Sequence, residues 1–297
     1  MNSRITSSMT ARMLLADIQR DSSRLATTQQ KMASGKEIVV PSDDPFATSR
    51  ALDFRSEVAE YRQYTRNVGE ATAWQDVTDT ALSTMTDLTM RARELLVQGA
   101  SDTVNQAGRN SIANEIDQIA AALKAEANTQ YAGRYVFAGT QTTTQPYNQA
   151  TDVYAGDSNA VVREIGRGVQ VPISVAGINV VGDGASGLLG ALRQIATDLR
   201  TPGSTAALGG ADLQALDVAL DAIVDARGNV GALTNRLDVA KSRLGQLEET
   251  TSKLLSETED ADMAKTLIDY SMQQSVYQAA LKAGAQLIQP SLLDFLR

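Results

Sequence analysis

The 297-residue sequence contains neither cysteine nor histidine. Their absence excludes disulfide bonds, thiol nucleophiles, zinc sites built from Cys and His, and a Ser-His-Asp catalytic relay. A metal site would need oxygen ligands alone. Aromatic residues make up only 4% of the chain, although such side chains fill much of the volume of compact cores. We therefore expect no enzyme, no cofactor and no metal, and we expect close-packed helices.

Basic clusters and long apolar runs are also missing. The formal net charge is −8, whereas a protein that binds nucleic acid or an anionic membrane usually carries a basic patch. Near the N-terminus the longest unbroken apolar run is Met13-Leu14-Leu15-Ala16, which is too short for a secretory signal. No stretch approaches the ~20 apolar residues of a membrane span. We expect no nucleic-acid partner and no membrane span. Any export would depend on a targeting signal other than a secretory signal peptide.

Residues 1–33 contain no proline or glycine and predict a helix with a narrow apolar seam. The seam repeats every seven residues at Ala11, Ile18, Leu25 and Met32, with Leu14 between them. This repeat is typical of a coiled coil, here about three heptads long. Gly35 is expected to end the helix.

The string Pro41-Ser42-Asp43-Asp44-Pro45 predicts the start of a second helix. Asp44 can cap the free backbone N–H groups, Pro45 suits the first helical position, and Asp43 is favourable at the positive helix end. Capping explains both aspartates without a catalytic carboxylate pair. The helix is expected to run from Phe46 to about Gln98, with a seam at Trp74, Ala81, Leu88 and Leu95. A shorter helix follows, with an apolar face formed by Ile112, Ile116, Ile119 and Leu123.

Around Tyr131 the composition changes to Gly, Thr, Tyr and Val. Apolar residues then alternate with other residues at Val169, Val171, Ile173 and Val175, which is the period of a strand. Gly166-Arg167-Gly168 separates this run from residues 161–165, so a hairpin is expected. We interpret residues 131–185 as a small β-rich insert.

Helical patterns return at Leu188–Leu199 and, after Pro202-Gly203, from about Asp212 onward. The second pattern is expected to continue to Pro290, with a kink or break possible at Gly228 and Gly231. Its seam repeats every seven residues at Ala226, Leu233, Ala240, Leu247, Leu254, Ala261 and Ile268, with a second position at Val230, Leu237 and Leu244.

These elements predict a mainly α fold: a long antiparallel helical bundle or coiled coil with paired N- and C-terminal helices, plus a small β-rich inserted domain. Each long helix has one apolar stripe that must be covered, and the simplest arrangement folds the chain like a hairpin. We predict three regions: residues 1–40 with 262–297 for assembly, 41–130 with 186–261 as the helical bundle, and 131–185 as the insert.

Two motifs suggest chemistry but have simpler explanations. Gly182-Asp183-Gly184-Ala185-Ser186-Gly187 matches G-x-G-x-x-G between an apolar segment expected as a strand (178–181) and a helix. No second parallel strand follows, so we interpret it as a flexible return from insert to bundle. The acidic group Glu257, Glu259, Asp260 and Asp262 lacks the spacing of a calcium loop. We interpret it as a solvated helix face, with an interaction face as the alternative.

The chain ends with four large apolar residues, Leu292, Leu293, Phe295 and Leu296. An exposed apolar end is unusual unless a partner covers it, so a polymer interface is favoured over a purely intramolecular coiled coil. We hypothesise that the N-terminal seam packs on the C-terminal one in the assembled state. The predicted interface comprises Ile5, Leu14, Ile18, Leu25, Met32, Ile268, Tyr277, Leu281, Ile288, Leu292, Leu293, Phe295 and Leu296.

Several strings resemble the flagellin-related axial proteins of the bacterial flagellum, and within them the hook–filament junction proteins. At the N-terminal side they are MASGK at 32–36 and PSDDP at 41–45, and the more discriminating GRYVFAGT at 133–140. At the C-terminal side they are EDADMA at 259–264, YQAA at 277–280 and the SLLDFL ending. The resemblance is strong over 1–140 and 225–297 and weak between them.

The resemblance implies a non-enzymatic, extracellular subunit exported unfolded by the flagellar type III apparatus, without a cleaved signal peptide. It implies a ring of copies between hook-associated protein 1 and the first flagellin subunits, and an export chaperone. It also implies terminal segments that order on assembly. A weak seam cannot offset its own ordering entropy alone, but it can do so when neighbours cover it.

Three alternatives remain at the level of sequence. A flagellin, the filament subunit, would have the same fold. A cytoplasmic coiled-coil adaptor would not need apolar terminal ends. An enzyme built on the insert is disfavoured because histidine and cysteine are absent.

Overall fold

The computed structural model describes residues 7–148, 151–184 and 186–288. The chain divides into two compact units, each treated by itself here: residues 1–60 with 248–297, and residues 61–247. Two long helices, α2 (Pro45–Ala100) and α6 (Leu213–Glu259), contribute residues to both units.

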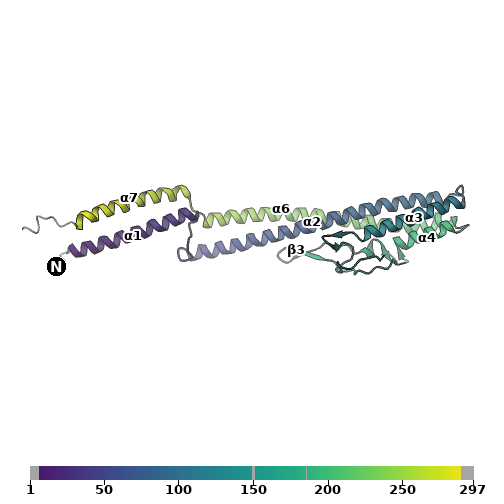
Figure 1. The fold of residues 1–297 in the computed structure, drawn as a ribbon, viewed down its shortest axis with the longest axis horizontal. Helices are drawn as coiled ribbons and strands as arrows, with labels where there is room; N and C mark the ends of the chain where they lie inside the picture. Colours follow the sequence, from purple (N-terminus) through teal and green to yellow (C-terminus); the bar gives the residue numbers. More distant parts are fainter. Residues whose placement is uncertain (1–6, 149–150, 185, 289–297) are drawn as a thin grey trace, which may run out of the picture. The chain divides into compact units, whose positions relative to one another are not determined.

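In the first unit, α1 (Ser7–Ser34) packs along α7 (Met263–Ile288), and Figure 1 shows the two helices side by side. Thr28 contacts Gln273, while Leu14 near the other end of α1 faces Gly284, so the two helices are antiparallel. The pairing of N- and C-terminal helices predicted from their apolar seams is thus confirmed. Gly35 ends α1 in a left-handed conformation with φ of +69°, as a helix C-terminus favours.

The C-terminal helical pattern is not continuous. It was expected to run from about Asp212 to Pro290, yet residues 260–262 separate α6 from α7. Gly228 and Gly231, the expected positions of a kink, lie inside an uninterrupted α6. The break occurs because Asp262 begins a new helix: its Oδ1 accepts hydrogen bonds from the backbone N–H groups of Ala264 (3.0 Å) and Lys265 (3.2 Å).

In the second unit, α3 (Gln106–Ala127) packs against α4 (Leu188–Arg200), and both share one core with α2 and α6. The apolar face predicted for the shorter helix is buried as expected at all four of its positions, Ile112, Ile116, Ile119 and Leu123. Trp74 is also buried and forms an edge contact with Tyr131. A short helix α5 (Thr205–Ala207) and a π-helical turn η2 (Leu208–Asp212) lead into α6.

The insert contains little regular strand. Its described residues and their immediate neighbours form three antiparallel pairs: β1 (Gln130–Tyr131) with β2 (Arg134–Tyr135), β3 (Val162–Gly166) with β4 (Val169–Pro172), and β5 (Gly182–Asp183) with β6 (Ser186–Gly187). The hairpin predicted around Gly166-Arg167-Gly168 is therefore confirmed; β3 is labelled in Figure 1. The strand expected at 178–181 is wrong, because Gly177–Asn179 form the 3₁₀ turn η1 and Val180 and Val181 continue into the core.

The observed architecture is the mainly α fold that the sequence predicts, with long paired helices and small strand-containing segments. The division into three regions at 40/41, 130/131, 185/186 and 261/262 remains a prediction. Along the described residues, no helix is both long and apolar enough to cross a membrane.

Candidate assembly interface

Five residues of the predicted interface lie where α1 pairs with α7. The least exposed positions of each helix follow the alternating spacing of four and three residues that is typical of a coiled coil. On α1 they include Leu14, Ile18, Asp21, Leu25, Thr28 and Met32. On α7 they include Thr266, Tyr270, Gln273, Tyr277, Ala280 and Gly284.

The contact between these two seams combines one polar pair with close packing at a glycine, and it buries few side chains. Thr28 Oγ1 donates to Gln273 Oε1 at 2.8 Å, and the missing side chain of Gly284 leaves room for Leu14 and Ile18. Among the described side chains of α1 and α7, only Thr28 and Thr266 are buried, together with Gly284. Each large apolar side chain of this seam therefore keeps part of its surface in solvent.

The outer surface of α7, by contrast, is strongly apolar. Six large apolar residues of α7 are exposed by 44% to 66%: Met263, Leu267, Ile268, Met272, Val276 and Leu281. On α1, Met9, Met13 and Leu15 are exposed as well. Several large apolar side chains left exposed along one helix make that helix a candidate protein interface. We call the six residues of α7 the outer face.

The structure distributes the sequence-predicted residues over both surfaces. Leu14, Ile18, Leu25, Met32 and Tyr277 lie on the α1–α7 seam, whereas Ile268 and Leu281 belong to the outer face. Ile288 ends α7, and its side chain is outside the described part. Ile5, Leu292, Leu293, Phe295 and Leu296 lie outside the described residues. Their common role in assembly stays a prediction.

A set of polar contacts, which we call the clasp, joins the loop after α1 to the break before α7. It consists of Gly35–Glu37, Arg55 and Glu259–Ala261. Lys36 and Asp260 form an isolated antiparallel β-bridge. The N–H of Glu37 donates to the carbonyl of Glu259 at 2.8 Å, and the N–H of Ala261 donates to the carbonyl of Gly35 at 2.9 Å.

The Glu259 carboxylate is the buried centre of the clasp. Its side chain is 5% exposed and forms ion pairs with Lys36 and Arg55. Arg55 Nε donates to Oε2 at 3.0 Å, while the Arg55 Nη2 and Lys36 Nζ atoms contact Oε1. The interpretation of the acidic group as a solvated face is thus wrong for Glu259. No local sequence pattern predicts that Glu259 pairs with cations from two distant segments.

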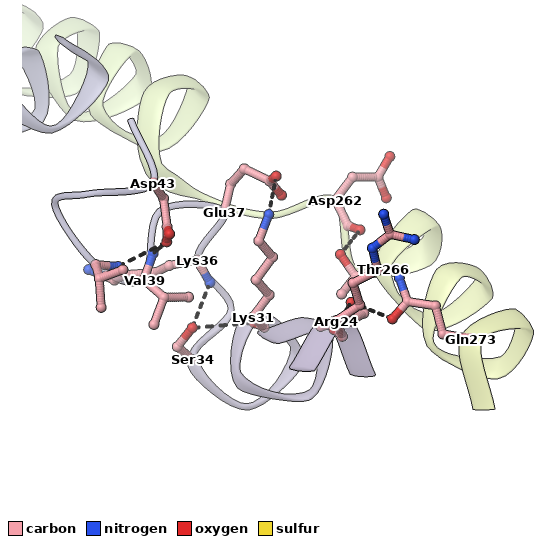
Figure 2. Close-up of polar contacts among 12 residues, drawn as sticks. Arg24, Lys31, Ser34, Lys36, Glu37, Val39, Asp43, Asp262, Thr266 and Gln273 are labelled. Atoms are coloured by element: carbon pink, nitrogen blue, oxygen red, sulfur yellow. Dashed lines mark hydrogen bonds and ion pairs between the residues drawn. The ribbon is translucent and has the colours of Figure 1, made fainter. Parts of the chain in front are cut away.

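Both helices that leave the clasp begin with an aspartate cap. Asp44 Oδ1 accepts from the N–H groups of Phe46 (3.0 Å) and Ala47 (2.9 Å), and Pro45 is the first residue of α2. Asp43 was expected to interact with the positive end of α2. Instead, its Oδ2 accepts hydrogen bonds from the backbone N–H groups of Val39 and Val40 (Figure 2). Asp43 therefore closes the loop before α2.

Figure 2 also shows how the loop after α1 is tied to its own helix. Lys31 Nζ, in the last turn of α1, contacts Glu37 Oε1 at 2.5 Å. Ser34 Oγ accepts from the backbone N–H of Lys36 at 3.2 Å. These contacts fix the direction in which the chain leaves α1, and with it the position of Lys36 beside Glu259.

The glycines of the G-x-G-x-x-G string have a structural explanation. Gly182 and Gly187 pair across β5 and β6 with φ of +87° and +114°. A Cβ on Gly182 would lie 2.4 Å from the carbonyl oxygen of Ser186, and a Cβ on Gly187 would lie 2.5 Å from Gly182 Cα. Only glycine fits such a crossing, so the motif needs no nucleotide. Among the described residues, no group of three or more Asp or Glu is arranged to hold a metal ion.

Comparison with known proteins identifies the family. Residues 5–142 match the bacterial flagellin N-terminal helical region, and residues 213–296 match the bacterial flagellin C-terminal helical region. Flagellar hook-associated protein 3 of Escherichia coli (strain K12) is 28% identical over 284 residues, covering 86% of this chain and 87% of that protein. Flagellin FlaB2 of Treponema pallidum (strain Nichols) is 25% identical over 287 residues, covering 90% and 91%.

A solved structure shows the same fold. The crystal structure of flagellar hook-associated protein 3 from Legionella pneumophila matches with a TM-score of 0.63 at 15% sequence identity. The match covers 69% of this chain and 97% of that one. The matches to both flagellin helical regions, which together cover most of the chain, show that it belongs to the flagellin-like superfamily.

Proposed function

We propose that this chain is a structural subunit of the bacterial flagellum that forms the junction between hook and filament. The relatives are structural proteins of the flagellum, so no catalytic step is assigned. One observation carries an assembly role. Few described side chains are buried between α1 and α7, whereas the large apolar residues of the outer face of α7 are exposed. Burial of the outer face by neighbouring copies would supply the apolar contact that the pair lacks by itself.

The proposal includes coupled ordering and assembly. Two helices that bury only two threonines and a glycine among their described side chains gain little to offset their ordering entropy. We expect them to exchange their amide hydrogens quickly in the isolated chain and slowly in the junction. Hydrogen exchange measures this directly. Strong protection throughout residues 1–33 and 270–297 of the purified monomer would contradict coupled ordering.

The proposed partners are further copies of this chain in a ring, hook-associated protein 1 on the hook side and flagellin on the filament side. Export as an unfolded chain through the type III apparatus, without a cleaved signal peptide, and an export chaperone belong to the same proposal. Two observations support these partners and this export route: the family to which the chain belongs, and the small number of side chains buried between α1 and α7.

Flagellin is the second candidate, favoured by the similarity to FlaB2 over most of the chain. The two functions differ in how far assembly continues. A flagellin should extend long filaments from filament seeds, whereas a junction protein should add a short zone and stop. Incubating the purified chain with hook and filament fragments, followed by electron microscopy, separates them.

Gene deletion tests the junction function in the cell. We expect hooks without filaments and unassembled flagellin in the medium, with recovery when the wild-type gene is supplied again. Normal filaments in the deletion strain would refute the proposal. Hooks without filaments that also lack exported flagellin would indicate an export defect instead.

A further inference from the structure

Methionine is the only sulfur-containing residue of this chain, because cysteine is absent. The described methionines concentrate on the two paired terminal helices. They are Met9, Met13 and Met32 on α1 and Met263 and Met272 on α7, whereas Met85 and Met90 lie on α2. Oxidants that attack sulfur therefore meet thioethers alone, and most of the described ones lie on α1 and α7.

Four of the five methionines on these two helices are exposed: Met9 by 47%, Met13 by 52%, Met263 by 47% and Met272 by 57%. We call these four residues the methionine set. On α2, Met90 is exposed by a similar fraction, 44%, whereas Met85 is fully buried. Because oxidation requires access to the sulfur atom, these two residues of α2 provide an exposed and a buried reference outside the set.

The methionines of α7 lie among aliphatic residues of the outer face. Met272 is four positions from both Ile268 and Val276, and Met263 is four positions before Leu267. Residues at this spacing are neighbours on a helix surface. An unbranched thioether adapts to irregular surfaces, which suits contact with neighbouring copies. Mild oxidation would change the sulfur atoms of this face and leave its aliphatic side chains unchanged.

A hydroperoxide oxidises an exposed methionine in one step. The sulfur lone pair attacks one peroxide oxygen, the O–O bond breaks and a sulfur–oxygen bond forms. The sulfur loses two electrons to the peroxide, and with hydrogen peroxide the other oxygen keeps both protons and leaves as water. The product, methionine sulfoxide, is polar, whereas the thioether is apolar.

We propose that the methionine set is a modification site whose oxidation to sulfoxide prevents assembly. The inference rests on the proposed function, because its consequence requires that neighbouring copies bury this surface. In the free chain, a sulfoxide at these exposed positions stays hydrated and leaves the fold intact. In the assembled state, a sulfoxide at Met272 would lie between Ile268 and Val276 in an apolar contact, where burying a polar group without a hydrogen bond is unfavourable.

Mass spectrometry of the full-length chain after treatment with hydrogen peroxide tests the site itself. The methionine set and Met90 should be oxidised about tenfold or more faster than Met85, which is buried. Far-UV circular dichroism of the treated chain should match that of the untreated chain. Equal oxidation rates for Met85 and the methionine set would overturn the assignment of the site.

Addition of the chain to hook fragments, counted by electron microscopy, tests the consequence. Peroxide treatment should reduce addition of the wild type about tenfold or more, and repair by methionine sulfoxide reductases with a dithiol as reductant should restore it. A variant that combines Met9→Leu, Met13→Leu, Met263→Leu and Met272→Leu should add equally well before and after treatment, whatever its untreated level. The matched control is Met90→Leu, which removes an exposed methionine outside the set and should lose addition on treatment as the wild type does.

The outcomes separate this inference from the proposed function. Equal addition by treated and untreated wild type would overturn the inference and leave the proposed function standing. Loss of addition on treatment of the fourfold leucine variant would overturn it as well, because the damaging oxidation would then lie outside the methionine set. Failure of the untreated wild type to add to hook fragments would refute the proposed function, and the inference with it.

Discussion

Arg55 Nε donates to Glu259 Oε2 at 3.0 Å, linking α2 to the last residue of α6. The same carboxylate pairs with Lys36, so one buried anion joins the loop after α1 to the break before α7. Removing one partner of a buried ion pair usually costs more than the pair itself contributes, because the remaining charges lose their compensation. Replacing the Glu259 carboxylate by a neutral amide of the same shape should therefore destabilise the clasp.

Glu259→Gln should loosen the clasp by about 2 kcal/mol, a value reduced from the fully buried case because Lys36 and Arg55 are half exposed. Amide exchange should accelerate at residues 35–37 and 259–263, and swimming should weaken. The control is Glu257→Gln, an exposed glutamate on the same helix turn, which should match the wild type. Unchanged exchange in Glu259→Gln would show that the backbone bridge alone holds the clasp.

The outer face of α7 provides a test of assembly apart from folding. Ile268 is 66% exposed, so Ile268→Asn should leave the thermal stability of the monomer unchanged. If neighbouring copies bury this side chain, the substitution removes about 1.5 to 3 kcal/mol of apolar contact per interface. Filament number per cell should then fall about tenfold or more, as counted by electron microscopy.

The matched control for that variant is Ser271→Asn, an exposed polar residue of the same helix. It should preserve both stability and filament number. Wild-type filament numbers in Ile268→Asn would exclude this part of α7 from the interface.

Local patterns predicted the helices well. The faces of α1 and α3 depend on spacings within a few turns, and both proved correct at Leu25 and Ile116, which are half-buried and buried. The phase of the C-terminal seam was predicted less well. Leu254 and Ile268 continue the seven-residue repeat but are exposed, whereas Thr251 is buried. A prediction based on apolar residues alone placed the seam on the wrong positions, because the buried positions near the break between α6 and α7 hold polar residues.

The remaining contacts depend on tertiary structure. Glu259 meets Arg55 across 204 positions, and no local rule brings them together. The break before α7 did have a local signal, since Asp262 is a typical N-cap residue, but the heptad repeat through Ala261 and Ile268 outweighed it.

Gly182 tests the hairpin that carries the G-x-G-x-x-G string. In Gly182→Ala, the new Cβ would approach the Ser186 carbonyl oxygen and Gly187 Cα to 2.4 and 2.5 Å, and the backbone has φ of +87°. We expect the free energy of unfolding in urea to fall by about 3 kcal/mol. Gly184→Ala is the control, because Gly184 has φ of +58° and open space around it. It should lose only about 1 kcal/mol, and equal losses would argue against the close crossing.

Tyr154 makes the stability of the insert depend on alkaline pH. Its hydroxyl lies 2.8 Å from the carbonyl oxygen of Phe137 and 2.9 Å from that of Asp157. Burial, with a smaller contribution from the Asp157 charge, raises the pKa of Tyr154 from 10 to about 12. Between pH 10 and 12 the unfolded chain therefore loses a proton that the folded chain keeps. The free energy of unfolding should fall across this window and be constant just below it.

Urea unfolding from pH 8 to 12, with tyrosinate absorbance as a second signal, measures this effect. Tyr154→Phe should be about 1 kcal/mol less stable at pH 8, because a hydrogen bond is lost, but its stability should fall less steeply above pH 10. Part of the slope should remain, since burial also raises the pKa of Tyr147, whose hydroxyl donates to the carbonyl of Gly182. An identical slope in Tyr154→Phe and the wild type would mean that Tyr154 has the same pKa in the folded and the unfolded chain, which would contradict the raised pKa.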